Sequence, residues 1–189
     1  LMLLHDSVLG KLGMCRAAIP PSSFGPQNKH LTPEMALFFA VSDTSVYLYN
    51  ALVPYTVAAL EHYFRSAFII LVRYSTSAQA RMESETRKVE MRDAIKISRG
   101  QLTIEDVIAD WYSFQSLDAV QKAFGDWLGI NIWSALRRQS QVAKSVSVVS
   151  DILSEIIRSR HDLVHGFELN YGLDEEGVEQ ILHSIEEVV

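Results

Sequence analysis

The sequence predicts an all-α fold, a helical bundle of about five to seven helices. Apolar residues recur at three- and four-residue intervals through several segments, and side chains that favour helix N-caps stand in front of them. No segment shows a convincing strand-like alternation, and no repeat has a solenoid period. The chain has 189 residues, 48% hydrophobic and 21% charged, which is enough for one domain with a sizeable core.

A single domain is expected over residues 32–189, after a poorly ordered or loosely packed leader over residues 1–31. The leader is predicted from its loop composition, in which prolines and a glycine stand among Ser, Gln and Asn residues. Thr32-Pro33-Glu34 then has the pattern of a helix start, with an N-cap, a first-turn proline and an acid favoured by the helix dipole. This helix is expected to run to about Tyr49, and Pro54 to mark a break or kink.

The middle of the chain is divided among several segments. Residues 81–99 are polar and highly charged, and they form either an exposed helix or a mobile connection. Asp106, three residues after Thr103, occupies a capping-box position. Helices are therefore expected over residues 57–71, from Thr103 onwards, from Ser116 to about Leu128, and over residues 130–139.

The clearest helix is predicted from Lys144 to about Val164, where apolar residues form one stripe. Gly166 is suited to its C-terminal end. Asp174 then caps a last amphipathic helix, whose buried face is expected to hold Val178, Ile181, Leu182, Ile185 and Val188.

The most apolar segment, residues 51–74, is interpreted as a core helix. It carries Glu61, His62 and Arg65 near its centre, and a membrane-spanning helix would bury them in hydrocarbon at a cost of several kcal/mol. No secretory signal is visible, and the single Cys15 cannot form an internal disulfide. A cytoplasmic protein without a membrane partner is therefore expected.

The net charge of −6 argues mildly against a nucleic-acid ligand, but the acids are unevenly distributed. Residues 166–189 hold seven Asp and Glu and no Lys or Arg. Subtracting these seven from the 23 acids leaves 16 against 17 bases in the rest of the chain, a balance of +1. The acidic end either faces away from an RNA or mimics one.

A cluster of polar residues interrupts the apolar stripe of the long helix. Arg160 lies in line with that stripe, where a guanidinium must be paired or must face an open site, because an unpaired buried charge is costly. His161, Asp162 and His165 follow it closely, just before Gly166. These residues are the strongest candidates for a functional site.

The stretch Arg160-His161-Asp162-Leu163-Val164-His165 resembles the motif of the HEPN superfamily, in which an Arg is followed by four to six residues and a His. In that family a polar residue commonly follows the Arg, as His161 does. An apolar helix before the motif, a glycine after it and a further amphipathic helix also fit. The helix carrying Glu61 and Arg65 resembles the acidic helix that often packs opposite the motif. The resemblance covers roughly residues 52–189.

The resemblance implies a homodimeric, metal-independent endoribonuclease that needs no cofactor, with the site at the subunit interface. His165 would take the proton from a ribose 2′-hydroxyl, and Arg160 would stabilise the charge that builds up on the phosphoryl oxygens. His161 would hold or orient the phosphate, with Glu61, Arg65 and Asp162 in support. A role as a toxin or in phage defence or stress, with a partner antitoxin, is implied in the same way. One branch of the family has a Tyr two residues after the His, and Phe167 stands there in this chain.

The geometry of a regular helix limits this arrangement. Residues five apart on an α-helix are about 140° apart around its axis, since one turn holds 3.6 residues. Arg160 and His165 therefore converge on one phosphate only if the helix unwinds near Gly166 or if a second chain completes the site. A helix C-terminus also favours imidazolium, which suits an acid more than a base.

Other interpretations of these residues remain open. Arg160 and His165 can instead form a structural cluster with Glu61 or a C-terminal acid, and Glu61 can pair with Arg65 four residues on. His161 and His165 have a metal-compatible spacing but lack a clear third ligand, so no metal is expected. The whole domain can be a non-catalytic interaction or nucleotide-binding module. Weaker candidates for an RNA-binding edge are Arg137, Arg138, Lys144 and Arg158.

Overall fold

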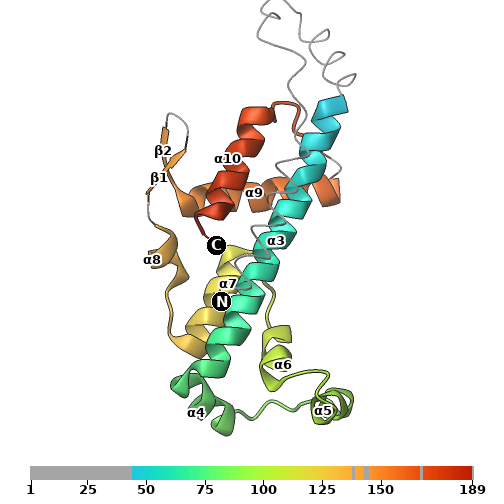
Figure 1. The fold of residues 1–189 in the computed structure, drawn as a ribbon, viewed down its shortest axis with the longest axis vertical. Helices are drawn as coiled ribbons and strands as arrows, with labels where there is room; N and C mark the ends of the chain where they lie inside the picture. The colour runs from blue at the N-terminus through green and yellow to red at the C-terminus, as the bar shows by residue number, and fades with distance from the viewer. Residues whose placement is uncertain (1–43, 138, 143–144, 167, 189) are drawn as a thin grey trace, which may run out of the picture.

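The computed structural model describes residues 44–137, 139–142, 145–166 and 168–188. Within these ranges the chain forms eight α-helices, one π-helical turn and one short β-hairpin (Figure 1). An all-helical fold is therefore confirmed in its main features, although five to seven helices is too low a number. The leader, the helix expected from Thr32 up to residue 43, and Cys15 lie outside the described residues.

The helix α3 (Thr44–Tyr74) is the central element of the fold. It contacts α4, α6, α7, α9 and α10, and Figure 1 shows it running diagonally through the molecule. The break expected at Pro54 is wrong, because the helix continues through it. Pro54 removes one backbone donor, but the neighbouring Val53 and Val57 are buried and hold both sides of the helix in the core. Across the described part of the chain, no helix combines the length and apolarity needed to cross a membrane.

The charged stretch at residues 81–99 is divided between two helices. It contains the end of α4 (Thr76–Ser84), a non-helical connection and α5 (Met91–Ser98), which has no buried residue. The next helix, α6 (Ile104–Asp110), begins with the expected capping box, since Thr103 accepts from the amide of Asp106 and the Asp106 carboxylate accepts from the amide of Thr103.

The two following helices agree with their predicted starts. Ser116 caps α7 (Leu117–Leu128), and Gly129 ends it with a φ of +66°, a conformation that suits glycine. Asn131 caps the shorter α8 (Ile132–Leu136), which ends before the predicted limit of 139.

The long helix predicted from Lys144 is wrong in its first turn. Strands β1 (Gln139–Val142) and β2 (Ser145–Val148) form an antiparallel hairpin, and α9 (Val149–His161) begins only after it. The sequence Ser-Val-Ser-Val in β2 alternates with the period of a strand, and this short pattern was assigned to the helix. The helix α9 is continued by the π-helical turn η1 (Asp162–Gly166), and the last helix α10 (Glu175–Glu186) is capped by Asp174 as predicted.

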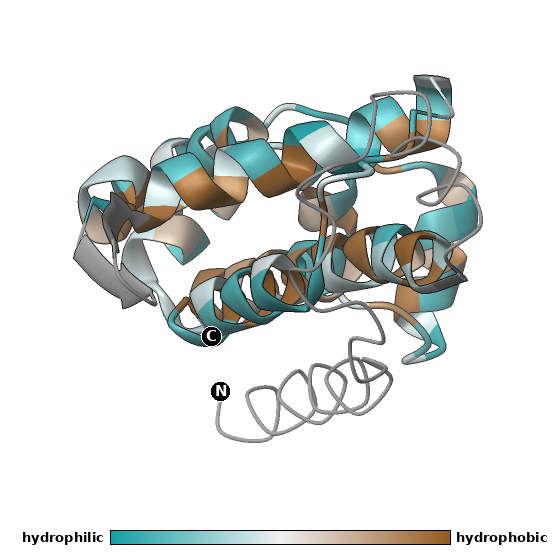
Figure 2. Cartoon of the chain, turned by 90° about the horizontal axis from the view of Figure 1, so that it is seen from above, coloured by the Kyte–Doolittle hydropathy of each residue, from teal (hydrophilic) through white to brown (hydrophobic). Residues whose placement is uncertain are grey.

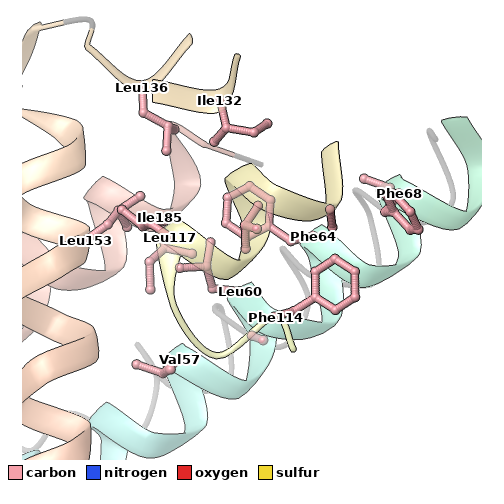
Figure 3. Close-up of a cluster of buried hydrophobic side chains, with 14 of the residues drawn as sticks. Val57, Leu60, Phe64, Phe68, Phe114, Leu117, Ile132, Leu136, Leu153 and Ile185 are labelled. Atoms are coloured by element: carbon pink, nitrogen blue, oxygen red, sulfur yellow. The ribbon is translucent and has the colours of Figure 1, made fainter. Parts of the chain in front are cut away.

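One buried core joins these elements. Figure 3 shows Val57, Leu60, Phe64 and Phe68 of α3 along one side of that helix, close to side chains from α7, α8, α9 and α10. Hydrophobic residues form stripes along the helices rather than covering them (Figure 2). Of the three tryptophans, Trp127 is buried, and Trp111 and Trp133 are partly buried against the core.

Candidate functional site

The candidate motif lies where α9 ends and η1 begins. Arg160 and His161 belong to the last turn of α9, and Asp162 and His165 to the π-helical turn. Hydrogen bonds in a π-helix join residues five apart, so its turn is wider than that of an α-helix. The helix is therefore wider near Gly166, which is one of the two ways in which Arg160 and His165 were expected to converge. π-helical turns inserted in α-helices occur frequently at functional sites.

The two histidines of the motif face solvent together. Both side chains are exposed, and their ring centroids are 4.5 Å apart at an interplanar angle of 44°. Two imidazoles at this separation are able to contact the same small group.

Arg160 is partly buried and lies near Glu61 of α3. Burial raises the pKa of the Glu61 carboxyl above its ordinary value, and the positive charge of Arg160 opposes this rise with a smaller effect. Glu61 Oε1 is buried and, among the described residues, has no hydrogen-bond partner. The structure thus brings Arg160 and Glu61 together across α9 and α3, as both the catalytic and the structural interpretation expect.

Two residues proposed to support the motif have other surroundings than expected. Arg65 forms ion pairs with α6, at 2.7 Å to Asp110 and 3.8 Å to Asp106, instead of a pair with Glu61. Asp162 lines a pocket on α9 that contains neither Arg160 nor either histidine of the motif. The sequence pattern does not reveal these positions, because the ion pair of Arg65 with Asp110 joins residues 45 apart and the π-helical turn changes which face Asp162 shares.

The weaker RNA-binding candidates are only partly described. Arg158 is exposed on α9, two residues before Arg160, and Arg137 is exposed at the end of α8. Arg138, Lys144 and Phe167 lie outside the described residues. No group of three or more His, Cys, Asp or Glu that could hold a metal ion occurs in the part of the chain that the structure describes.

Sequence reasoning did not anticipate a pocket of about 470 Å³ between α3, α9, η1, α10 and the loop before α10. Asn50 bonds this loop to α3, since its amide donates to the carbonyl of Asn170 at 3.0 Å and its carbonyl accepts from the Asn170 amide at 2.7 Å. The pocket lies between residues that are far apart in the sequence, so no local sequence pattern predicts it. Its lining residues are Asn50, Val53, Ile152, Glu155, Ile156, Ser159, Asp162, Leu163, Glu168, Leu169, Asn170, Leu173, Gly177, Gln180 and Ile181.

A comparison of the chain with models of protein families, with curated proteins and with solved structures finds no match. The candidate site therefore stands on its own residues and on their resemblance to the HEPN motif.

Proposed function

We propose that this chain is a metal-independent endoribonuclease of the HEPN type, with Arg160, His161 and His165 as its catalytic residues. The observation that carries the proposal is the pair of exposed imidazoles, 4.5 Å apart at a π-helical turn directly after Arg160. This group joins a fixed positive charge to two side chains that exchange protons near neutral pH.

The residues have distinct roles in the proposed reaction. His165 removes the proton from a ribose 2′-hydroxyl, and the 2′-oxygen attacks the adjacent phosphorus. Arg160 donates hydrogen bonds to the phosphoryl oxygens while negative charge builds up on them. An imidazolium then protonates the leaving 5′-oxygen, so the products carry a 2′,3′-cyclic phosphate and a free 5′-hydroxyl.

The second imidazole gives this scheme its acid. His161 of the same chain stands beside His165, and a homodimer would add a second copy of both rings. Val164, between the two histidines in the sequence, is 43% exposed, and an apolar side chain beside the proposed catalytic residues suits a surface covered by a second subunit. We therefore place the subunit interface at η1.

In this scheme, Glu61 affects how much positive charge Arg160 presents to the RNA phosphate. A carboxylate near the guanidinium orients it, but it also offsets part of the charge that the phosphate would meet. Because burial raises the pKa of Glu61, the protonated form of this carboxyl becomes easier to populate and leaves more of the positive charge of Arg160 for RNA.

The test is cleavage of single-stranded RNA by the full chain in excess chelator. Arg160→Ala, His161→Ala and His165→Ala are each expected to lower the cleavage rate by about 100-fold or more, the range of acid–base catalysis. Arg92→Ala and His183→Ala are the matched controls, since these exposed residues pair with acids on α5 and α10 away from the motif. Circular dichroism and the elution volume check that each variant is folded. A wild type that leaves RNA intact overturns the proposal.

The alternative to the nuclease function is a non-catalytic interaction module, and the pocket beside α9 is the observation that favours it. Three carboxylates line that pocket, from Glu155, Asp162 and Glu168, and they repel the phosphates of a nucleotide. A nucleotide-binding module is therefore the weaker form of this rival. A wild type that cuts no RNA would favour a binding function over the nuclease, whereas normal cleavage by all three motif variants would remove these residues from the active site.

A further inference from the structure

We propose that the pocket between α3, α9, η1 and α10 binds a small aliphatic polyamine. This inference goes beyond the nuclease proposal, since the pocket contains none of the three proposed catalytic residues. Its volume of about 470 Å³ lies within the range of small-molecule sites.

Aliphatic side chains form part of the pocket lining. Val53 and Ile156 are buried in its base, and further aliphatic side chains that are only partly buried surround them. These partly buried side chains are Ile152, Leu163, Leu169, Leu173 and Ile181. A hydrocarbon chain placed against this surface would remove apolar area from water, which stabilises the complex.

The polar part of the lining is acidic. Glu155 comes from α9, Asp162 from η1 and Glu168 from the loop that follows, and all three residues are exposed. Among the described residues, no Lys, Arg or His lines the pocket, and no ion pair involves these three carboxylates. These carboxylates favour a ligand that carries positive charge.

The arrangement of the acids suits an extended organic cation better than a metal ion. The three carboxylates come from three segments and do not form a group that could hold a metal ion. Positive charges that are spaced along a hydrocarbon chain can meet separate carboxylates while the methylene groups contact the aliphatic walls. Ser159 and Gln180 add hydrogen-bonding groups to the lining. Spermidine combines these features and is the probe that we choose.

The experiment is calorimetric titration of the full chain with spermidine at low ionic strength. We expect saturable binding near one equivalent. Glu155→Gln and Glu168→Gln should each weaken binding by about 2- to 5-fold, the value of an exposed ion pair, with a larger loss in the double variant. Asp151→Asn is the matched control, because this exposed acid of α9 does not line the pocket.

Two comparison ligands distinguish specific binding in the pocket from binding by charge alone or by hydrocarbon alone. Mg²⁺ tests charge alone, and 1,8-octanediol tests the hydrocarbon chain alone. Both should bind more weakly than spermidine. Equal binding of Mg²⁺, an equal loss in Asp151→Asn, or binding of a lysine-rich peptide without binding of spermidine would each overturn the proposal. None of these readouts depends on RNA cleavage, so the outcome is separable from that of the nuclease test.

Discussion

The charge of Arg160 and the burial of Glu61 act in opposite directions on the Glu61 carboxyl. A guanidinium in line with an apolar stripe needs a partner or an open site, and Arg160 has elements of both, since it is partly buried and close to a carboxylate. Desolvation of Glu61 outweighs the attraction of Arg160, because the pKa of Glu61 is raised overall. The sequence indicated this pair from residue types alone, but not the balance between the two effects.

A pH-dependent stability difference is expected for Glu61→Gln. The pKa of Glu61 is raised above the ordinary value of 4.5, so the folded chain binds this proton more tightly than the unfolded chain does. The contribution of Glu61 to the free energy of unfolding therefore falls as the pH rises from about 4.5 through the higher folded-state pKa. Glutamine does not titrate, so urea unfolding should show the variant gaining stability relative to the wild type over that interval. A constant difference, or a relative loss, would contradict this assignment.

The turn η1 and the loop after it form the element on which both proposals depend. His165 belongs to η1 and His161 directly precedes it, while Asp162 and Leu163 of η1 line the pocket. The backbone amide of Glu168 donates to the carbonyl of Asp162 at 3.3 Å, which closes the end of this turn. The geometry of the catalytic motif and the shape of the pocket therefore depend on the same five residues.

Asn50→Ala is expected to destabilise this region. Asn50 is 3% exposed, and its side chain bonds to the carbonyl of Val46 and to both backbone groups of Asn170. Its loss leaves the amide of Asn170 without this partner, at a cost of about 1 to 3 kcal/mol in the free energy of unfolding. Chemical denaturation measures the loss, and hydrogen exchange should be faster at Asn170. The exposed Gln115→Ala serves as the control, and equal stability of the two variants would refute the role of Asn50.

The elements that the sequence predicted well are those fixed by neighbouring residues. The caps at Thr103, Ser116 and Asp174 need only a side chain and an amide two or three residues away, and all three are present. The errors occur where local preference competes with packing. Pro54 disfavours a helix locally, yet the core keeps α3 continuous, and the hairpin before α9 gains its hydrogen bonds only from a second strand.

At the scale of the molecule, the two proposed sites differ in the sign of their charge. Arg158, Arg160 and His161 lie at the end of α9 and His165 in η1, whereas the described residues that line the pocket include three acids and no base. The motif could be identified from the sequence, because its residues are close together in the chain. The pocket was not predicted, since it combines α3 with segments more than 100 residues later, as the Asn50–Asn170 contact illustrates.

Val164→Glu is expected to convert the proposed homodimer into a monomer. Val164 is 43% exposed, so a charged side chain at this position can remain in water without disturbing the fold, but it would oppose burial at an interface. Light scattering coupled to size exclusion measures the mass. Val89→Glu is a matched control, since Val89 is 37% exposed on the connection before α5. A monomeric wild type, or a dimer unaffected by Val164→Glu, would remove η1 from the interface.

The most direct measurement of the central claim uses a DNA oligonucleotide that contains one ribonucleotide, incubated with the full chain in excess chelator. Attack by the 2′-hydroxyl predicts a single cut after the ribose, with a 2′,3′-cyclic phosphate on one fragment and a 5′-hydroxyl on the other. The Arg160→Ala and His165→Ala variants are expected to make no cut. An all-RNA oligonucleotide in the same assay guards against a need for neighbouring riboses. Cleavage of the all-DNA strand, a 5′-phosphate on the product, or intact RNA and chimera together would contradict the account.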